Sequence, residues 1–124
     1  MEKNNLPKII PVFPLSNFIL FPKTSVPLNI FEPRYIDMIN DSMKLNKLIG
    51  MIQPFGSNDI EELPPKLHTI GCLGKITSFK ETDNGTFLVE LKGLVRFETI
   101  NEIESNKKYR QYEVNFEKFQ NDLK

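Results

Sequence analysis

Prolines dominate the first third of the chain and restrict what it can form. They stand at positions 7, 11, 14, 22, 27 and 33, too close together for a helix. The residues between them are mostly apolar, so we predict short strands at residues 9–13, 17–21 and 26–31, separated by turns. Pro11 and Pro14 cannot donate ladder hydrogen bonds, which indicates a sheet edge or a bulge at these positions.

From Pro33 onwards the pattern becomes helical. Tyr35, Ile39 and Met43 fall on one face of a helix, while polar side chains fall on another. Pro33 suits the first helical position, where its missing N–H group costs nothing. We predict one main helix over about residues 33–46.

The rest of the chain is predicted to be rich in strands. Residues 48–52 form a nearly continuous apolar run, which fits a strand buried on both faces. Residues 54–66 have the composition of a long surface loop. Alternating apolar and polar side chains, broken by turn residues, predict strands at residues 70–80, 86–92, 94–103 and 109–119, with turns at residues 83–85 and 92–93.

These expected elements fit one domain over residues 1–124. A chain of 124 residues with 40% apolar composition can form a modest single core. Six or more short strands with one helix indicate a β-rich α+β fold. We expect a closed or half-closed β-barrel with the helix lying across it.

Charge and cysteine content limit the expected partners and compartment. Sixteen basic and sixteen acidic residues give a formal charge of zero, so nucleic-acid binding has no global electrostatic support. The single cysteine, Cys72, suits a reducing compartment, and the cytoplasm is expected. No run approaches the roughly 18 apolar residues that a membrane span needs, so no membrane partner is expected.

The sequence contains no assembled catalytic or metal-binding set. His68 and Cys72 are the only residues of their kinds, so a zinc site would have to borrow carboxylates. Asp59, Glu61 and Glu62 form an acidic group in the expected long loop, which we interpret as solvated and not as an acid/base pair. We therefore expect no catalytic residue, no metal and no cofactor.

The high content of phenylalanine is the most unusual feature of the composition. The chain has ten phenylalanines, several of them in short segments broken by proline. Either all of them fill the core, or some remain exposed and mark a protein-binding surface. The five in question are Phe13, Phe18, Phe21, Phe31 and Phe55.

Several short motifs follow one another in a specific order. PVFPL at residues 11–15, LFP at residues 20–22 and PLNIFEPRY at residues 27–35 are followed by weaker matches up to about residue 119. This combination resembles the N-terminal domain of the ATP-dependent protease Lon. The resemblance implies a PUA-like β-barrel, the β-rich half of that domain, which is associated with substrate recognition and with assembly of the hexamer. The same module occurs in stand-alone bacterial proteins and in the ubiquitin-ligase receptor cereblon.

In Lon the barrel is followed by a helical subdomain, an ATPase module and a protease module with a Ser-Lys dyad. The sequence ends at Lys124, about where those helices would begin. We therefore expect neither ATP hydrolysis nor proteolysis from these residues.

The expected function is that of a non-catalytic protein-binding domain. It would capture unfolded or degron-bearing polypeptides, within a Lon-type protease hexamer or as a modulator of one. The expected site comprises Phe31, Glu32, Arg34, Tyr35 and Phe55. Two interpretations of Glu32 and Arg34 stay open, namely local polar contacts that fix the helix start, or the lining of a binding groove.

A PUA-like module that binds RNA or a small ligand is the alternative. RNA-binding domains generally present a basic surface. Here Arg34, Arg96 and Arg110 are the only arginines in a neutral chain, so nucleic acid is a disfavoured partner.

Overall fold

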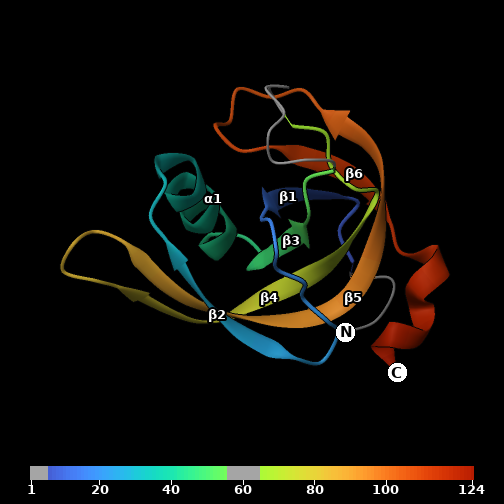
Figure 1. Ribbon diagram of the computed structural model, residues 1–124, viewed down its shortest axis with the longest axis horizontal. Helices are drawn as coiled ribbons and strands as arrows, with labels where there is room; N and C mark the ends of the chain where they lie inside the picture. The colour runs from blue at the N-terminus through green and yellow to red at the C-terminus, as the bar shows by residue number, and fades with distance from the viewer. Residues whose placement is uncertain (1–5, 56–64) are drawn as a thin grey trace.

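A computed structural model describes residues 6–55 and 65–124 of the chain. Within these residues, none of the helices is long and apolar enough to cross a membrane. Figure 1 shows the arrangement of the elements. In chain order they are β1 (Ile9–Pro14), β2 (Ser25–Ile30), α1 (Pro33–Met43), β3 (Leu48–Ile52), β4 (Ile70–Glu81), β5 (Phe87–Ile103), β6 (Gln111–Asn115) and the 3-10 helix η2 (Glu117–Leu123).

The strands form one mixed sheet that closes nearly into a ring. Their order is β2-β5-β4-β3-β1-β6, and β5 pairs with β6 as well, which joins the two sides of the ring. The β1–β3 pair is parallel and the other pairs are antiparallel. In Figure 1, β5 curves around the right side of the ring, and α1 lies at the left. The predicted β-rich barrel with one main helix is confirmed.

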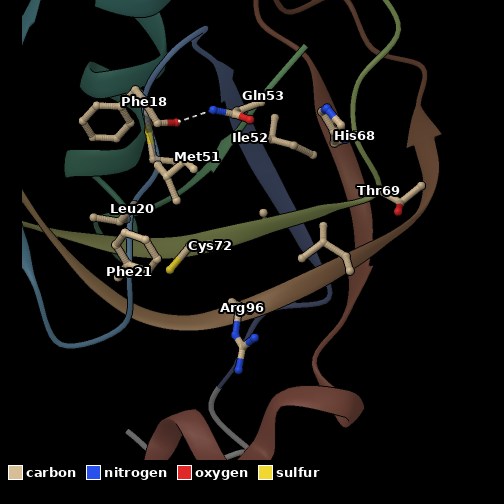
Figure 2. A pocket seen from close by; sticks show the side chains of 13 residues that line it. Phe18, Leu20, Phe21, Met51, Ile52, Gln53, His68, Thr69, Cys72 and Arg96 are labelled. Atoms are coloured by element: carbon tan, nitrogen blue, oxygen red, sulfur yellow. Dashed lines mark hydrogen bonds between the residues drawn. The ribbon is translucent and has the colours of Figure 1, made fainter. Parts of the chain in front are cut away.

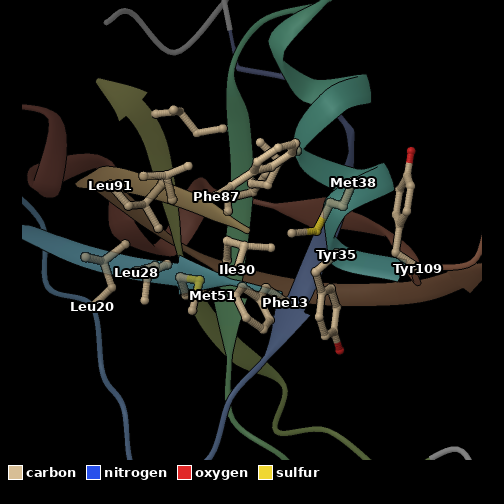
Figure 3. Close-up of a cluster of buried hydrophobic side chains, with 14 of the residues drawn as sticks. Phe13, Leu20, Leu28, Ile30, Tyr35, Met38, Met51, Phe87, Leu91 and Tyr109 are labelled. Carbon is tan, nitrogen blue, oxygen red and sulfur yellow. The ribbon is translucent and has the colours of Figure 1, made fainter. Parts of the chain in front are cut away.

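Strand β3 separates two apolar clusters. Leu48 and Ile52 belong to the cluster inside the ring, while Ile49 and Met51 belong to the cluster under α1. All five residues of β3 are buried, as the apolar run predicts for a strand covered on both faces. Figure 3 shows the cluster under α1, to which residues of β1, β2, β3, α1 and β5 contribute.

Helix α1 begins at Pro33 as predicted but ends at Met43, three residues before the predicted end. Residues 44–46 form a turn, and Lys47 adopts a left-handed backbone with φ of 63°. The N–H of Lys47 donates to the carbonyl of Ser42 at 2.9 Å, so the chain folds back over the last helical turn. The Tyr109 hydroxyl donates to the Asp41 carboxylate at 2.6 Å and ties the helix to the chain before β6.

The strand predicted at residues 17–21 is not present. Within the described part of the chain, these residues pair with no strand and instead cross from β1 to β2 between two turns. Asn17 and Lys23, at these turns, have left-handed backbones with φ of 60° and 70°. Burial nevertheless alternates along the segment as it does in a strand, since Leu20 is buried while Ile19 and Phe21 are exposed. The apolar run in the sequence could not indicate the lack of a pairing partner.

The turn predicted at residues 92–93 is also wrong, because β5 runs through this position without a break. Gly93 pairs with Gly74 of β4, and its main chain exchanges hydrogen bonds of 2.8 Å with Lys23 and Thr24. A Cβ atom at Gly93 would lie 2.1 Å from the carbonyl oxygen of Phe21. The glycine therefore allows the main chain of Phe21 to pass directly over β5.

The final predicted strand is shorter than expected, because β6 ends at Asn115 and η2 follows. The Asn115 side-chain oxygen accepts a hydrogen bond of 2.7 Å from the N–H of Glu117, which starts the helical turn. Phe116 is buried in the ring cluster, and Phe119 and Leu123 pack against that cluster. Most of the predicted loop at residues 54–66, with Asp59, Glu61 and Glu62, lies outside the described residues.

The crossing over Gly93 gives a test of the fold. Gly93→Ala places a methyl group against main-chain atoms that have no room to move, so we expect a loss of about 3 kcal/mol of stability, the upper end for an overpacked core. Thermal and urea unfolding measure this change in the free energy of unfolding. Gly85→Asn is the control, because space around Gly85 is open and asparagine tolerates its positive φ. Equal melting temperatures for Gly93→Ala and the parent protein would contradict this account.

Candidate functional site

A mainly apolar pocket lies where the crossing segment meets the ring. Its volume is about 310 Å³, and it is lined by residues 18–21, 51–53 and 68–72 together with Arg96. These residues come from the crossing segment, from the end of β3, from the start of β4 and from the middle of β5. Figure 2 shows Phe18, Leu20 and Phe21 on one side of this space and His68 and Thr69 on the other.

Large apolar side chains at this pocket are exposed. Ile19, Phe21 and Ile70 have exposed fractions of 60%, 58% and 47%, and all three line the pocket. Single exposed apolar residues are ordinary on a protein surface, but a group of them around a pocket typically marks a binding surface.

The crossing segment is held firmly although it belongs to no strand. The Gln53 side-chain amide donates to the carbonyl of Phe18 at 3.2 Å (Figure 2). Leu20 is buried in the cluster under α1, and the main chain of Lys23 and Thr24 is bonded to Gly93. The wall of the pocket formed by residues 18–21 is therefore fixed at both ends and in the middle.

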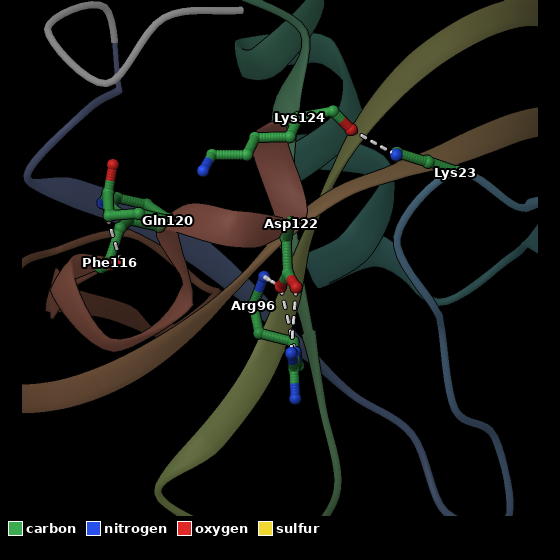
Figure 4. A network of polar contacts seen from close by, with 6 residues as sticks. All are labelled: Lys23, Arg96, Phe116, Gln120, Asp122 and Lys124. Carbon is green, nitrogen blue, oxygen red and sulfur yellow. Dashed lines mark hydrogen bonds and ion pairs between the residues drawn. The ribbon is translucent and has the colours of Figure 1, made fainter.

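Among the described residues that line the pocket, Arg96 is the one arginine or lysine, and its side chain is paired. Its Nε and Nη2 atoms donate to the two carboxylate oxygens of Asp122 at 2.9 and 2.8 Å, and its main-chain N–H donates to the same carboxylate at 3.0 Å (Figure 4). The guanidinium also lies over the ring of Phe119, 4.6 Å from its centre. The hydrogen bonds from Arg96 lower the pKa of Asp122 below its ordinary value of 3.8. In Figure 2 the guanidinium points away from the other labelled side chains.

Cys72 and His68 both line the pocket, but they do not form a reactive pair. Burial raises the pKa of the Cys72 thiol to about 12, so the thiol stays protonated at neutral pH and is a poor nucleophile. The His68 ring packs edge-on against Phe55, with ring centres 5.1 Å apart. Among residues 6–55 and 65–124, no group of three or more His, Cys, Asp or Glu residues is placed to hold a metal ion.

Comparison with known proteins places the chain in a family. The model of the ATP-dependent protease La (Lon) substrate-binding domain matches residues 9–123 of the chain. The chain belongs to this family.

Lon proteases are among its relatives. A Lon protease of Flavobacterium johnsoniae is 31% identical over 109 residues, and one of Desulfosudis oleivorans is 32% identical over 104 residues. The alignments cover 88% and 83% of this chain but 13% of each relative. The chain thus spans about an eighth of the length of the curated Lon proteases that it matches.

Two solved structures share the fold. A Lon N-terminal domain protein from Xanthomonas campestris matches with a TM-score of 0.68 and 24% identity, over 87% of this chain and 59% of that one. The N-terminal domain of a Mycobacterium avium complex Lon protease matches with a TM-score of 0.64 and 16% identity, over 88% and 54% of the two chains. At these identities the likeness concerns the fold alone.

Within this Lon-type fold, the site residues expected from the sequence lie at two separate places. Phe31, Glu32, Arg34 and Tyr35 surround the start of α1 and line a small pocket of about 140 Å³. Phe55 does not join them, because it packs against His68 beside the larger pocket. Their roles in binding stay predictions.

Contacts at the start of α1 are local. Arg34 and Glu32 form an ion pair of 3.1 Å with both side chains about half exposed, and the Arg34 guanidinium lies over the Tyr35 ring at 4.7 Å. Tyr35 is buried, and its ring packs on Phe13 with centres 4.3 Å apart. These contacts agree with a role in fixing the helix start, and a groove lined by Glu32 and Arg34 remains the other interpretation.

The five phenylalanines singled out in the sequence differ in their exposure. Phe13 is buried and Phe18 is partly buried, whereas Phe21, Phe31 and Phe55 are exposed. Sequence reasoning did not select Ile19 or Ile70, because both fall in segments expected to be half-buried strands. The sequence did contain one signal for this site, the LFP motif at residues 20–22, which places two apolar residues directly before a proline turn.

The Arg96–Asp122 pair predicts a pH dependence. Because the pKa of Asp122 is lower in the folded state than in an unfolded chain, the pair stabilises the fold above pH 3.8 and this contribution is lost as pH falls through the folded-state pKa. We expect Asp122→Asn to remove it, so the melting temperature of the variant falls less than that of the parent between neutral pH and pH 3.

Glu98→Gln provides the matched control for this experiment. Glu98 pairs with Lys118 at 2.9 Å on the surface of the same strand, and exposed pairs contribute little to stability. Its pH profile should follow that of the parent protein. If the melting temperature of Asp122→Asn changes with pH as that of the parent does, the Arg96–Asp122 pair does not stabilise the fold.

Proposed function

We propose that this domain binds unfolded or degron-bearing polypeptides at the apolar pocket between residues 18–21 and the start of β4, and that it does so without catalysing a reaction. It would act within a Lon-type protease hexamer or as a modulator of one. The observation that carries the proposal is the grouping of exposed Ile19, Phe21 and Ile70 at an apolar pocket in a member of a substrate-binding family.

The chemistry of the pocket supports an apolar occupant. Among the residues that the structure describes, no aspartate or glutamate lines it, and its arginine is paired with Asp122. Unfolded polypeptides differ from folded ones in that their apolar side chains are exposed, and burial of those side chains is the main favourable term in most protein association. A pocket of this kind would therefore favour unfolded segments over folded surfaces.

The start of α1 is the second surface that belongs to this proposal. Exposed Phe31 stands there next to Glu32 and Arg34. Its pocket is less than half the volume of the larger one, so we place the main contact at residues 18–21 and treat the α1 surface as the competing position.

RNA binding gains no support from the arginines. Arg34 pairs with Glu32, Arg96 with Asp122, and Arg110 with Glu102 at 2.8 Å. Phosphate groups would have to displace these carboxylates. Protein binding is therefore the function that we carry forward.

Two single variants separate the candidate surfaces. We expect Phe21→Ser to weaken binding of a reduced, carboxymethylated model protein about tenfold or more, the effect of losing one buried aromatic contact. Phe31→Ser should bind like the parent domain. Amide chemical shifts in a titration give the dissociation constants, and melting temperatures check that both variants fold.

Leu45→Ser is the matched control, since Leu45 is exposed but lines neither pocket. The opposite ranking, with binding lost in Phe31→Ser and kept in Phe21→Ser, would move the site to the start of α1. If the parent domain binds no unfolded protein at high micromolar concentration, the proposed function fails.

A further inference from the structure

Residues 18–21 have the burial pattern of a strand but pair with no strand in the described part of the chain. Exposed Ile19 and Phe21 alternate with buried Leu20. Within residues 6–55 and 65–124, the N–H groups of residues 18–21 and the carbonyls of Ile19 and Leu20 have no hydrogen-bond partner. The carbonyls of Phe18 and Phe21 are satisfied, by Gln53 and by Thr24. The middle of the segment thus offers donors and acceptors.

The main chain of this segment faces the pocket. All four consecutive residues line it, although side chains along an extended segment point alternately to opposite sides. Side chains alone would therefore contribute only every second residue. The contribution of all four indicates that the backbone itself forms part of the pocket wall.

The segment is fixed in place before any partner arrives. Left-handed residues bracket it at Asn17 and Lys23, Leu20 is anchored in the cluster under α1, and Gly93 lets the main chain of Phe21 rest on β5. A partner strand would then meet a template that loses little conformational freedom on binding.

Charge and volume specify the occupant. None of the lining residues in the described ranges is acidic, and the arginine of the pocket is paired with Asp122, so these residues offer no unpaired charge to a charged side chain. A volume of about 310 Å³ is at the lower end for ligand pockets, which suits side chains of an extended chain better than a helix or a folded surface.

We propose that the occupant is an extended, uncharged, apolar polypeptide segment that pairs as an added strand with the main chain of residues 18–21. Its alternate side chains enter the pocket between Phe21 and Ile70. Strand addition of this kind takes its affinity from main-chain hydrogen bonds and its preference from the pockets for alternate side chains. The inference rests on the proposed function and adds the conformation that the site selects.

Backbone methylation of the ligand tests this pairing directly. The probe is a short capped peptide of alternating isoleucine and threonine, compared with two forms that are N-methylated at the isoleucines or at the threonines. The N–H groups of alternate residues point to opposite edges of a strand, so each form blocks one edge only. Titrations against the intact domain, followed by amide shifts, give three dissociation constants.

Pairing along one edge predicts that one methylated form loses about tenfold or more in affinity, the effect of one or two lost main-chain hydrogen bonds, while the other binds like the parent peptide. The amides of one alternating pair, either Phe18 and Leu20 or Ile19 and Phe21, should also gain protection from hydrogen exchange when the unmethylated peptide binds. Equal affinity for all three peptides would overturn strand pairing and leave the pocket as the binding site. Loss with both methylated forms would overturn it too, because the methyl groups would then act by bulk. If the unmethylated peptide and the unfolded protein both fail to bind, the proposed function itself fails.

Discussion

The passage of the Phe21 main chain over Gly93 connects the barrel to its pocket. Strand β5 pairs with β2, β4 and β6, so nearly every part of the ring depends on its course. Gly93 lies inside this strand, and its lack of a side chain leaves room for the chain that crosses from β1 to β2. The crossing segment then forms one wall of the pocket. Gly93 thus lies where the continuous strand β5 meets the wall of the candidate pocket.

Much of the architecture could be predicted from the sequence because it depends on local patterns. Pro33 marks the start of α1, and the apolar run at residues 48–52 indicates a strand covered on both faces. Gly93 was misread for a physical reason. A glycine between apolar residues is compatible with a tight turn and with the close approach of another chain, and only the tertiary structure distinguishes the two.

The same limit applies to the site. The apolar run at residues 18–21 shows neither which of its side chains point inwards nor whether a partner strand exists. Arg96 and Asp122 are 26 positions apart, so neither sequence neighbourhood shows that the charge at the pocket is neutralised. Composition left open whether any phenylalanine is exposed, and it could not rank Phe21 against Phe31 because that ranking depends on what surrounds each ring.

Left-handed residues at Asn17 and Lys23 have a consequence for solubility. Unpaired main chain at the edge of a sheet is a template on which further copies of a protein can stack. Here the backbone turns away at both ends of a short stretch, so any second strand is confined to a few residues. This segment therefore offers an unpaired edge of only a few residues, which is too short to seed growth into a fibre.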